Sequence, residues 1–229
     1  MKKNFLLLSL TALLAWAAPA FSENTPVSTA PAVNWRETVR SFAEKNLKHP
    51  AWGYSHSVRI YKMALELAGE DKIKLDDDVM FASAYLHDMG AFAPYAKQDK
   101  DHADTAVARM ETVLSATDFP KDKIEAVRSA IRTHMYQRKP EGNEAVYLHD
   151  ADALDWLGAV GAARVLALID KNGGAPNGAM AVQFMEDNLS KVPAQVFSKA
   201  GKARVPARVK ELKTFIEQLR AETADLKDF

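Results

Sequence analysis

The segment AYLHDMG, residues 84–90, places a histidine and an aspartate side by side at the end of an apolar run. His87 continues a stripe of apolar residues spaced three or four apart, which is the spacing of one face of an α-helix. Gly90 is expected to break that helix, so that the chain turns away and His87 and Asp88 lean toward one point. The segment therefore predicts a helix whose end carries an inward-facing pair of potential metal ligands.

Three further histidines, His56, His102 and His134, continue apolar stripes on neighbouring predicted helices. A single inward histidine is more often a hydrogen-bonded core residue than a metal ligand. Four of them on four successive helices, accompanied by inward acids, favour the second interpretation, because burying so many ionisable groups is costly unless a cation gathers them. The pattern therefore indicates a metal site.

Helical periodicity dominates from Asn34 onward, and the sequence shows no strand-like alternation. Capping residues, glycines and prolines divide the chain into predicted helices. Their expected bounds are Asn34 onward, about 54–68 with Gly69 as the stop, 76–88, 101 to about 116, 120 to about 135, about 144–170, and an amphipathic tail helix around 209–219. Residues 34–229 are enough for one sizeable core and too few to suggest two. We predict a single all-α domain.

The first 22 residues have the pattern of a signal peptide. Two lysines precede a mostly apolar run from Phe5 to Trp16, and AFS at 20–22 has the small-x-small pattern of a cleavage site. The apolar run is shorter than the roughly 20 residues that cross a bilayer. Residues 23–33, rich in Pro, Ser and Thr, are expected to be a flexible lead-in. We therefore predict a periplasmic or secreted protein without stable membrane association after cleavage.

The composition excludes several classes of function. Thirty basic residues balance thirty acidic ones and no basic cluster stands out, so we expect no binding to nucleic acid. Because the chain has no cysteine, it can form neither a disulfide, nor a zinc–thiolate site, nor a thiol nucleophile. Neither a phosphate-binding loop nor a dinucleotide-binding fingerprint is present. Any metal must therefore be held by histidine and carboxylate.

Four motifs follow one another across the predicted helices: His56, the pair His87-Asp88, His134, and the segment DADALDWLG at 150–158. Together they resemble the HD superfamily of metal-dependent phosphohydrolases over about residues 52–165. The nearest subgroup is the small, stand-alone HD hydrolases with an Asp-Ala-Asp-Arg-Leu-Asp sequence. This resemblance implies a helical bundle with the metal site between its central helices.

The resemblance implies that the primary metal ligands are His56, His87, Asp88 and Asp152. The expected cofactor is a divalent metal ion: imidazole and carboxylate ligands suit Mn, Fe, Co, Ni or Zn, and Mg is a further candidate. A divalent ion lowers the pKa of a bound water and neutralises a phosphoryl oxygen, which serves phosphoester hydrolysis without a protein nucleophile. One ion per chain is expected rather than two. Asp88 is expected to act in catalysis as well, by orienting the water.

The resemblance also suggests roles for residues around the ligands. His102 and His134 match positions that bind a second metal in two-metal members or contact phosphate in one-metal members, and we favour substrate contact for His102 and proton transfer for His134. Arg59 and Lys139 are expected to contact the phosphate, although for Lys139 a merely solvated position is equally expected. Asp155 is expected to orient a ligand.

Four remaining positions are expected to be structural, to lie off the apolar stripes or to depart from the pattern. Arg164 is expected to be structural, and His49 and His149, which lie off the stripes, are expected at the surface or beside the ligands. Ala153 stands where the subgroup has arginine, so the subgroup's substrates cannot simply be inherited.

The sequence predicts a periplasmic metal-dependent phosphohydrolase that cleaves a phosphoester or phosphoanhydride of a small phosphorylated molecule such as a nucleotide. One alternative is a di-iron oxygenase, because His102 and His134 could complete a second ion site. Another is a catalytically silent metal- or ligand-binding protein, for which Ala153 is the best support. The sequence does not set the oligomeric state.

Overall fold

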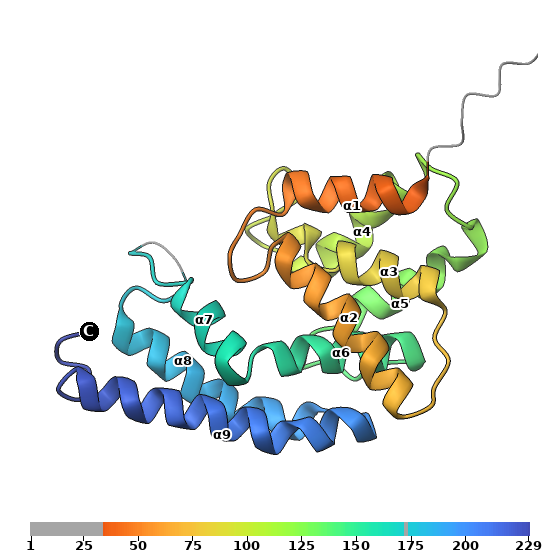
Figure 1. The fold of residues 1–229 in the computed structure, drawn as a ribbon. Helices are drawn as coiled ribbons and strands as arrows, with labels where there is room; N and C mark the ends of the chain where they lie inside the picture. The colour runs from red at the N-terminus through yellow and green to blue at the C-terminus, as the bar shows by residue number, and fades with distance from the viewer. Residues whose placement is uncertain (1–33, 172–173) are drawn as a thin grey trace, which may run out of the picture. The chain divides into compact units, whose positions relative to one another are not determined.

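Apart from one isolated bridge between Ile169 and Ala175, the regular structure of residues 34–171 and 174–229 is helical, and these are the residues that the computed structural model describes (Figure 1). The described helices are α1 (Trp35–Asn46), α2 (Tyr54–Glu70), α3 (Asp77–Leu86), α4 (His102–Leu114), α5 (Ile124–Arg132), α6 (Asn143–Asp155), α7 (Gly158–Leu166), α8 (Gly178–Lys191) and α9 (Lys199–Glu222), with 3₁₀ turns η1 (Met89–Ala91), η2 (Lys121–Lys123) and η3 (Val192–Gln195). The predicted all-α fold is confirmed. The predicted signal peptide and lead-in, residues 1–33, lie outside the described residues.

Short polar side chains begin three of the helices at the predicted places. Asn34, Asp76 and Asp101 each accept hydrogen bonds from two backbone amides in the first turn of α1, α3 and α4. Such caps satisfy amides that have no partner within the helix and each contributes about 1 kcal/mol. They therefore fix where these helices start.

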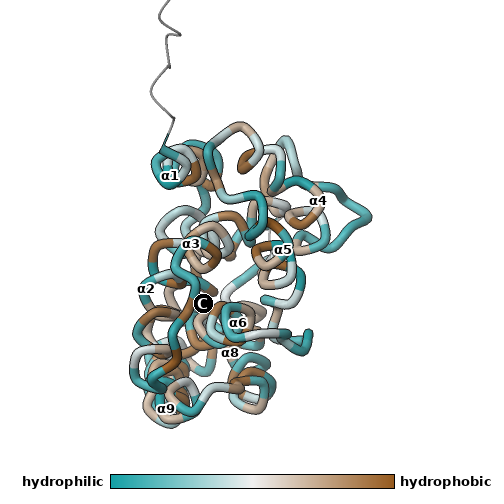
Figure 2. The backbone as a smooth tube through the Cα atoms, turned by 90° about the vertical axis from the view of Figure 1, so that its right-hand side faces the viewer, coloured by the Kyte–Doolittle hydropathy of each residue, from teal (hydrophilic) through white to brown (hydrophobic). Residues whose placement is uncertain are grey.

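The pair of α2 and α6 lies in the middle of the arrangement. The α3 and α5 helices pack against this pair and are covered in turn by α1 and α4, whereas α7, α8 and α9 pack together at the opposite end. Figure 2 shows the same order from the side, with α1 and α4 at one end and α9 at the other. Because α2, α3, α5 and α6 meet in the middle, side chains at their facing ends can converge.

The predicted apolar stripes form the core. Ile60 and Leu67 of α2, like Met80 and Leu86 of α3, are fully buried. Each fully buried aliphatic side chain of this size contributes about 1.5–3 kcal/mol relative to an exposed one. The stripes of α2 and α3 therefore anchor the two helices that lead to the site.

The prediction of a single helix over 144–170 is wrong. It is divided into α6 and α7 at Gly158, whose φ of +68° is strained for any residue with a Cβ atom. A Cβ at Gly161 would also overlap the backbone carbonyl of Trp156, so the chain turns back tightly. This break leaves α6 short enough to end beside the site.

Other predicted bounds shift by a few residues, and one helix was not expected. The α3 helix ends at Leu86 and α5 at Arg132, so the histidines that follow them lie in turns. Gly69 does not stop α2, which continues to Glu70. Neither α8 nor the full length of α9 was predicted. No described helix is both long and apolar enough to span a membrane.

Candidate metal centre

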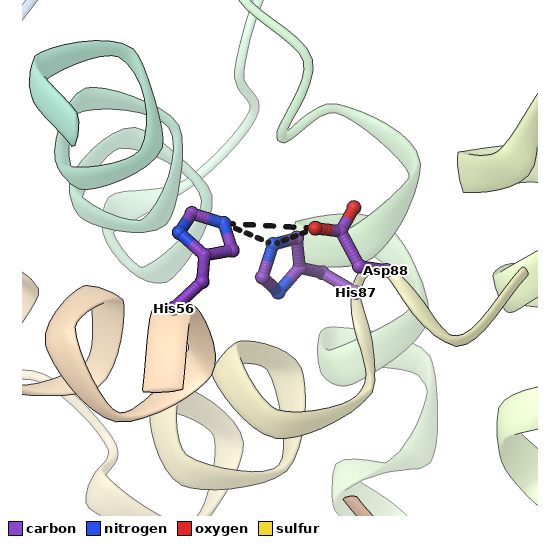
Figure 3. Close-up of side chains that lie close together, drawn as sticks. All are labelled: His56, His87 and Asp88. Atoms are coloured by element: carbon purple, nitrogen blue, oxygen red, sulfur yellow. Dashed lines mark hydrogen bonds and ion pairs between the residues drawn. The ribbon is translucent and has the colours of Figure 1, made fainter. Parts of the chain in front are cut away.

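Three potential ligands meet where the N-terminal turn of α2 faces the turn after α3. His56 Nε2 lies 3.2 Å from His87 Nε2 and 3.6 Å from Asp88 Oδ2, and His87 Nε2 lies 3.2 Å from the same oxygen. Figure 3 shows the two rings and the carboxylate directed toward one another. All three donor atoms lie within 4.8 Å of one another. The spacing suits a single bound cation.

Asp152 adds a fourth donor from α6. Its Oδ1 atom lies 3.2 Å from His56 Nε2, and the residue is buried. The four ligands that the resemblance implied are thus gathered from α2, the turn after α3, and α6. They are separated by up to 96 positions in sequence, as 152 − 56 shows, and only the packing of α6 along α2 brings them together.

The second oxygen of Asp88 faces another pair of histidines. Its Oδ1 atom lies 3.4 Å from His102 Nε2 and 3.8 Å from His134 Nε2. These three donors also lie within 4.8 Å of one another. His134 Nε2 is buried without a hydrogen-bond partner, which is costly for a polar atom unless a ligand satisfies it. Asp88 therefore lies between two groups of donors.

The Nδ1 atom of each buried histidine of the centre has a hydrogen-bond partner. His87 Nδ1 lies 2.9 Å, and His134 Nδ1 2.7 Å, from the carbonyl oxygen three residues earlier, and His56 Nδ1 lies 2.8 Å from Asp155 Oδ2. An imidazole that donates from Nδ1 presents a lone pair at Nε2. The Nε2 lone pairs are therefore aimed at the centre.

Asp155 connects the centre to two arginines. It accepts two hydrogen bonds from Arg59, at 3.1 and 2.8 Å, and lies 3.1 Å from Arg164 Nη1. Burial raises the pKa of Asp155, but His56 and the two arginines hold it well below its ordinary range. Asp155 thus stays charged and orients the ring of His56, as expected for a residue that acts through a ligand.

The protonation states of the central groups suit a cation. Burial raises the pKa of Asp88, but the adjacent His87 outweighs it and holds that pKa well below its ordinary range. Burial also raises the pKa of Asp152, and contact with His56 more than offsets this and lowers it to about 2. Burial, followed by the charge of His87, lowers the pKa of His134 to about 4. At neutral pH the carboxylates are ionised and His134 is neutral.

The donor set fits a divalent metal ion. Two imidazole nitrogens 3.2 Å apart with ionised carboxylate oxygens beside them require positive charge, which is either a metal ion among them or a proton on His87, whose pKa burial lowers and Asp88 more than restores. Two nitrogens and two oxygens are ligands that Mn, Fe, Co, Ni and Zn accept.

A cavity of about 390 Å³ opens at this centre. Asp88, Asp152 and His102 line it, and the substrate contact of His102 stays a prediction. Within the described part of the chain, neither Arg59 nor Lys139 lines the cavity: the first is bound to Asp155 and the second is exposed. Their predicted phosphate contact stays a prediction.

Two sequence interpretations concerned positions near the second His-Asp pair. His149 is fully buried, so the expected surface position is wrong. Its Nδ1 atom lies 3.1 Å from Asp150 Oδ1, and Asp150 accepts hydrogen bonds from the amides of Phe197 and Ser198, which holds the start of α9. Ala153 is buried in the core, where an arginine would need a charged partner.

The sequence reasoning missed the cavity walls. Trp52, Tyr136, Trp156 and Phe184 all line the cavity. A signal was available for one of them, since Trp156 directly follows the segment that carries Asp152. The other aromatic residues have no local pattern that separates a cavity wall from ordinary core.

A comparison with family models matches the central part of the chain. Residues 53–157 match the model described as "HD domain". The chain contains an HD domain. The matched residues include the four implied ligands and end in the turn after α6. HD domains bind divalent metal ions, and the donors of this HD domain fit one.

Solved structures of similar fold include three bacterial proteins. A Lactobacillus plantarum protein has a TM-score of 0.61 at 24% identity, covering 83% of this chain and 98% of its own. A predicted HD superfamily hydrolase from an uncultured Thermotogales bacterium has a TM-score of 0.57 at 24% identity, covering 82% and 90%. Bacillus subtilis YpgQ in complex with ADP has a TM-score of 0.59 at 18% identity, covering 82% and 97%. These likenesses show the fold. A comparison with curated proteins finds no match.

The HD domain match leaves part of the site outside it. Arg164 on α7 and Phe184 on α8 line the cavity but lie beyond residue 157. The four ligands that the resemblance implies therefore lie within the matched residues, whereas one side of the cavity comes from the helices that follow them.

Proposed function

We propose that this protein is a metal-dependent phosphohydrolase that cleaves a phosphoester or phosphoanhydride bond of a small molecule. The observation that carries the proposal is the convergence of two imidazole Nε2 atoms and two ionised carboxylates on one point that opens into a cavity. His56, His87, Asp88 and Asp152 would hold the ion. Bound there, a divalent ion lowers the pKa of water and offsets negative charge on a phosphoryl oxygen.

The protein's own groups divide the remaining work. Asp88 presents Oδ1 toward His102 and His134, and there it accepts a hydrogen bond from the attacking water and orients it. Neutral His134 accepts a proton at its unpartnered Nε2 atom. Burial lowers the pKa of His102, but Asp88 outweighs this and raises it, so the protonated ring donates to the leaving oxygen or to a phosphoryl oxygen.

Elemental analysis of the purified protein, prepared without chelator, tests the centre. We expect one metal per chain in the native protein, its loss in Asp88→Ala and its retention in His134→Ala. A panel of phosphoesters and phosphoanhydrides, assayed with Mn, Fe, Co, Ni, Zn or Mg, is expected to yield phosphate or pyrophosphate. Absence of metal after reconstitution would leave a helical binding protein, and metal without any turnover would favour a silent metal- or ligand-binding protein.

A second candidate rests on the donors around Asp88 Oδ1. His102, His134 and this oxygen are close enough to hold another ion, which supports a two-ion centre. Two metals per chain, one of them lost in His134→Ala, would support it. Oxygen consumption by the iron-loaded protein would then favour a di-iron oxygenase over a phosphohydrolase.

The proposed location is the periplasm or the outside of the cell. It is supported by the signal-peptide pattern of the first 22 residues. Cell fractionation with N-terminal sequencing is expected to find a chain that begins near Glu23 outside the cytosol. An unprocessed chain in the cytosolic fraction would contradict the proposal.

A further inference from the structure

Four aromatic residues from four separate segments line the cavity at the metal centre. Trp52 comes from the α1–α2 connection, Tyr136 from the α5–α6 connection, Trp156 from the turn after α6, and Phe184 from α8. Aromatic walls gain free energy by covering flat apolar surface. Since a dry cavity of roughly 150 Å³ holds one benzene ring, the volume of about 390 Å³ has room for more than a phosphoryl group.

Two of the aromatic walls are held in place by neighbouring side chains. Trp52 stacks on His49, with ring centroids 4.1 Å apart and planes 6° from parallel. The guanidinium of Arg164 lies 3.7 Å from the ring centroid of Trp156, which also contacts Phe184 at 5.5 Å. Rings held in place lose little conformational entropy when a ligand packs on them, so these walls are organised in advance for a flat partner.

The same cavity offers little positive charge. Of the described residues that line it, Arg164 is the only lysine or arginine. Its side chain is 3% exposed and lies 3.1 Å from Asp155 and 3.7 Å from Asp152, so its charge is already matched by two carboxylates. One phosphoryl group can be balanced at the metal centre. Apart from His102, which lies beside Asp88 at the metal centre, no described lining side chain offers an unmatched positive charge to a second or third phosphate, so desolvating that phosphate is costly.

We propose that the substrate is a phosphomonoester of an aromatic or otherwise flat, apolar alcohol, an inference that rests on the proposed phosphohydrolase function. The single phosphoryl group lies at the metal centre and the apolar body packs against the four aromatic walls. The oxygen of water forms a bond to phosphorus while the ester P–O bond breaks. One proton of that water goes to the leaving oxygen, so the products are the free alcohol and inorganic phosphate.

A binding comparison isolates the cavity from the chemistry. Phenylphosphonate and methylphosphonate share a head group that is not hydrolysed at its C–P bond, and differ in the ring. Calorimetric titration of the metal-loaded protein is expected to show at least about tenfold tighter binding of phenylphosphonate, because the ring is buried against apolar walls. Equal affinity for the two compounds would overturn the proposal.

Two phenylalanine variants make a matched pair for this titration. Phe184→Ala removes a wall and is expected to reduce the preference for phenylphosphonate severalfold. Phe197→Ala removes a ring that is 39% exposed, lies against His149 and does not line the cavity, so the preference is expected to persist. A preference that survives Phe184→Ala, or disappears in both variants, would contradict the assignment of this cavity.

Measuring the hydrolysis of four phosphate compounds distinguishes a failure of the apolar-substrate proposal from a failure of the proposed phosphohydrolase function. We compare kcat/KM for 2-naphthyl phosphate, glycerol phosphate, adenosine monophosphate and adenosine triphosphate, with 2-naphthyl phosphate expected to be highest. A higher value for either nucleotide would overturn the apolar-substrate proposal and leave the phosphohydrolase intact. If none of the four releases phosphate or pyrophosphate from the metal-loaded protein, the proposed function fails, and the phosphonate titration still decides whether the cavity takes an apolar ring.

Discussion

Replacing Asp155 with asparagine is expected to weaken both metal binding and folding. The carboxylate is fully buried and accepts from His56 Nδ1 at 2.8 Å and from Arg59 at 2.8 and 3.1 Å, with Arg164 Nη1 at 3.1 Å. Asparagine keeps the shape but carries no charge, and its amide nitrogen cannot accept a hydrogen bond. The variant therefore leaves two arginines without a counter-charge and frees the ring of His56.

The two arginines contribute unequally to the loss of stability. Arg59 has a side chain that is 32% exposed, so water can replace much of its interaction. Arg164 is 3% exposed, and removing one partner of a buried ion pair costs about 3–5 kcal/mol. Because Asp152 remains 3.7 Å away, we expect the lower end of that range, about 3 kcal/mol. Loss of the partner that orients a metal-bound histidine reduces metal affinity by about 10–100-fold.

Two measurements check these values separately. Urea unfolding of chelator-treated protein gives the free energy of unfolding, and competition with a chromogenic chelator gives the metal affinity. Asp187→Asn is the matched control, because this exposed carboxylate pairs with Lys191 on the same helix and its loss is expected to cost less than about 1 kcal/mol. Metal affinity that stays within about twofold of the native value would refute the argument that Asp155 orients His56.

Three further predictions address packing, pH and the metal. A Cβ at Gly90 would overlap a backbone carbonyl at the start of α4, so Gly90→Ala is expected to lower the free energy of unfolding by about 1–3 kcal/mol. A Cβ at Gly69 meets nothing within 4 Å, so Gly69→Ala is expected to raise the free energy of unfolding by about 0.5–1 kcal/mol. Denaturant unfolding that ranks the two variants in the opposite order would contradict this prediction. Lys123 lowers the pKa of Asp78 and, against the opposing effect of burial, that of Asp76. The stability that these two lowered pKa values contribute is fully present above the unfolded pKa of aspartate, near 4, and is lost as pH falls through the pKa values of the folded protein. Lys123→Ala is therefore expected to flatten the decline of Tm below about pH 5. A decline as steep as that of the native protein would disprove this prediction. Chelation is expected to lower Tm and a divalent ion to restore it, because an ion that binds only the folded chain stabilises it; an equal Tm with and without bound ion would count against the centre.

The helix starts and the inward placement of the histidines could be predicted because both depend on local patterns. Asn34, Asp76 and Asp101 cap helices through amides two or three residues away, which a sequence displays directly. His56 and His87 were placed inward by apolar neighbours at helical spacing, and both are fully buried. Such short-range signals survive tertiary packing.

The break between α6 and α7 could not be predicted in the same way. Almost every residue of α6 after Asn143 and Glu144 is buried, so the helix has no polar face to mark its length. Gly158 adopts its positive φ beside α9, where a Cβ would meet the side chain of Glu211. A glycine inside a helical pattern reveals such a turn only when the neighbouring helix is known.

The cavity walls were equally hidden in the sequence. Trp52 and Phe184 are 132 positions apart, as 184 − 52 shows, and no periodicity relates them. Their shared surface follows from the packing of α7 and α8 at the end of the α2–α6 pair. The α8 helix itself buries several small residues, including Gly178 and Ala181, which give a weak contrast between its two faces.

Arg164 contacts both the cavity wall formed by Trp156 and the carboxylates of Asp152 and Asp155. Its guanidinium lies over Trp156, faces Asp152 and Asp155, and donates from Nε to the carbonyl oxygen of Ala51. A substitution that widens the cavity at Trp156 therefore also disturbs the charge balance at the ion. Phe184 and Tyr136 are uncharged walls, and within the described residues neither forms a hydrogen bond or ion pair with Asp152 or Asp155, so substitutions there can reshape the cavity, by mutation or by design, without changing the charges at the proposed centre.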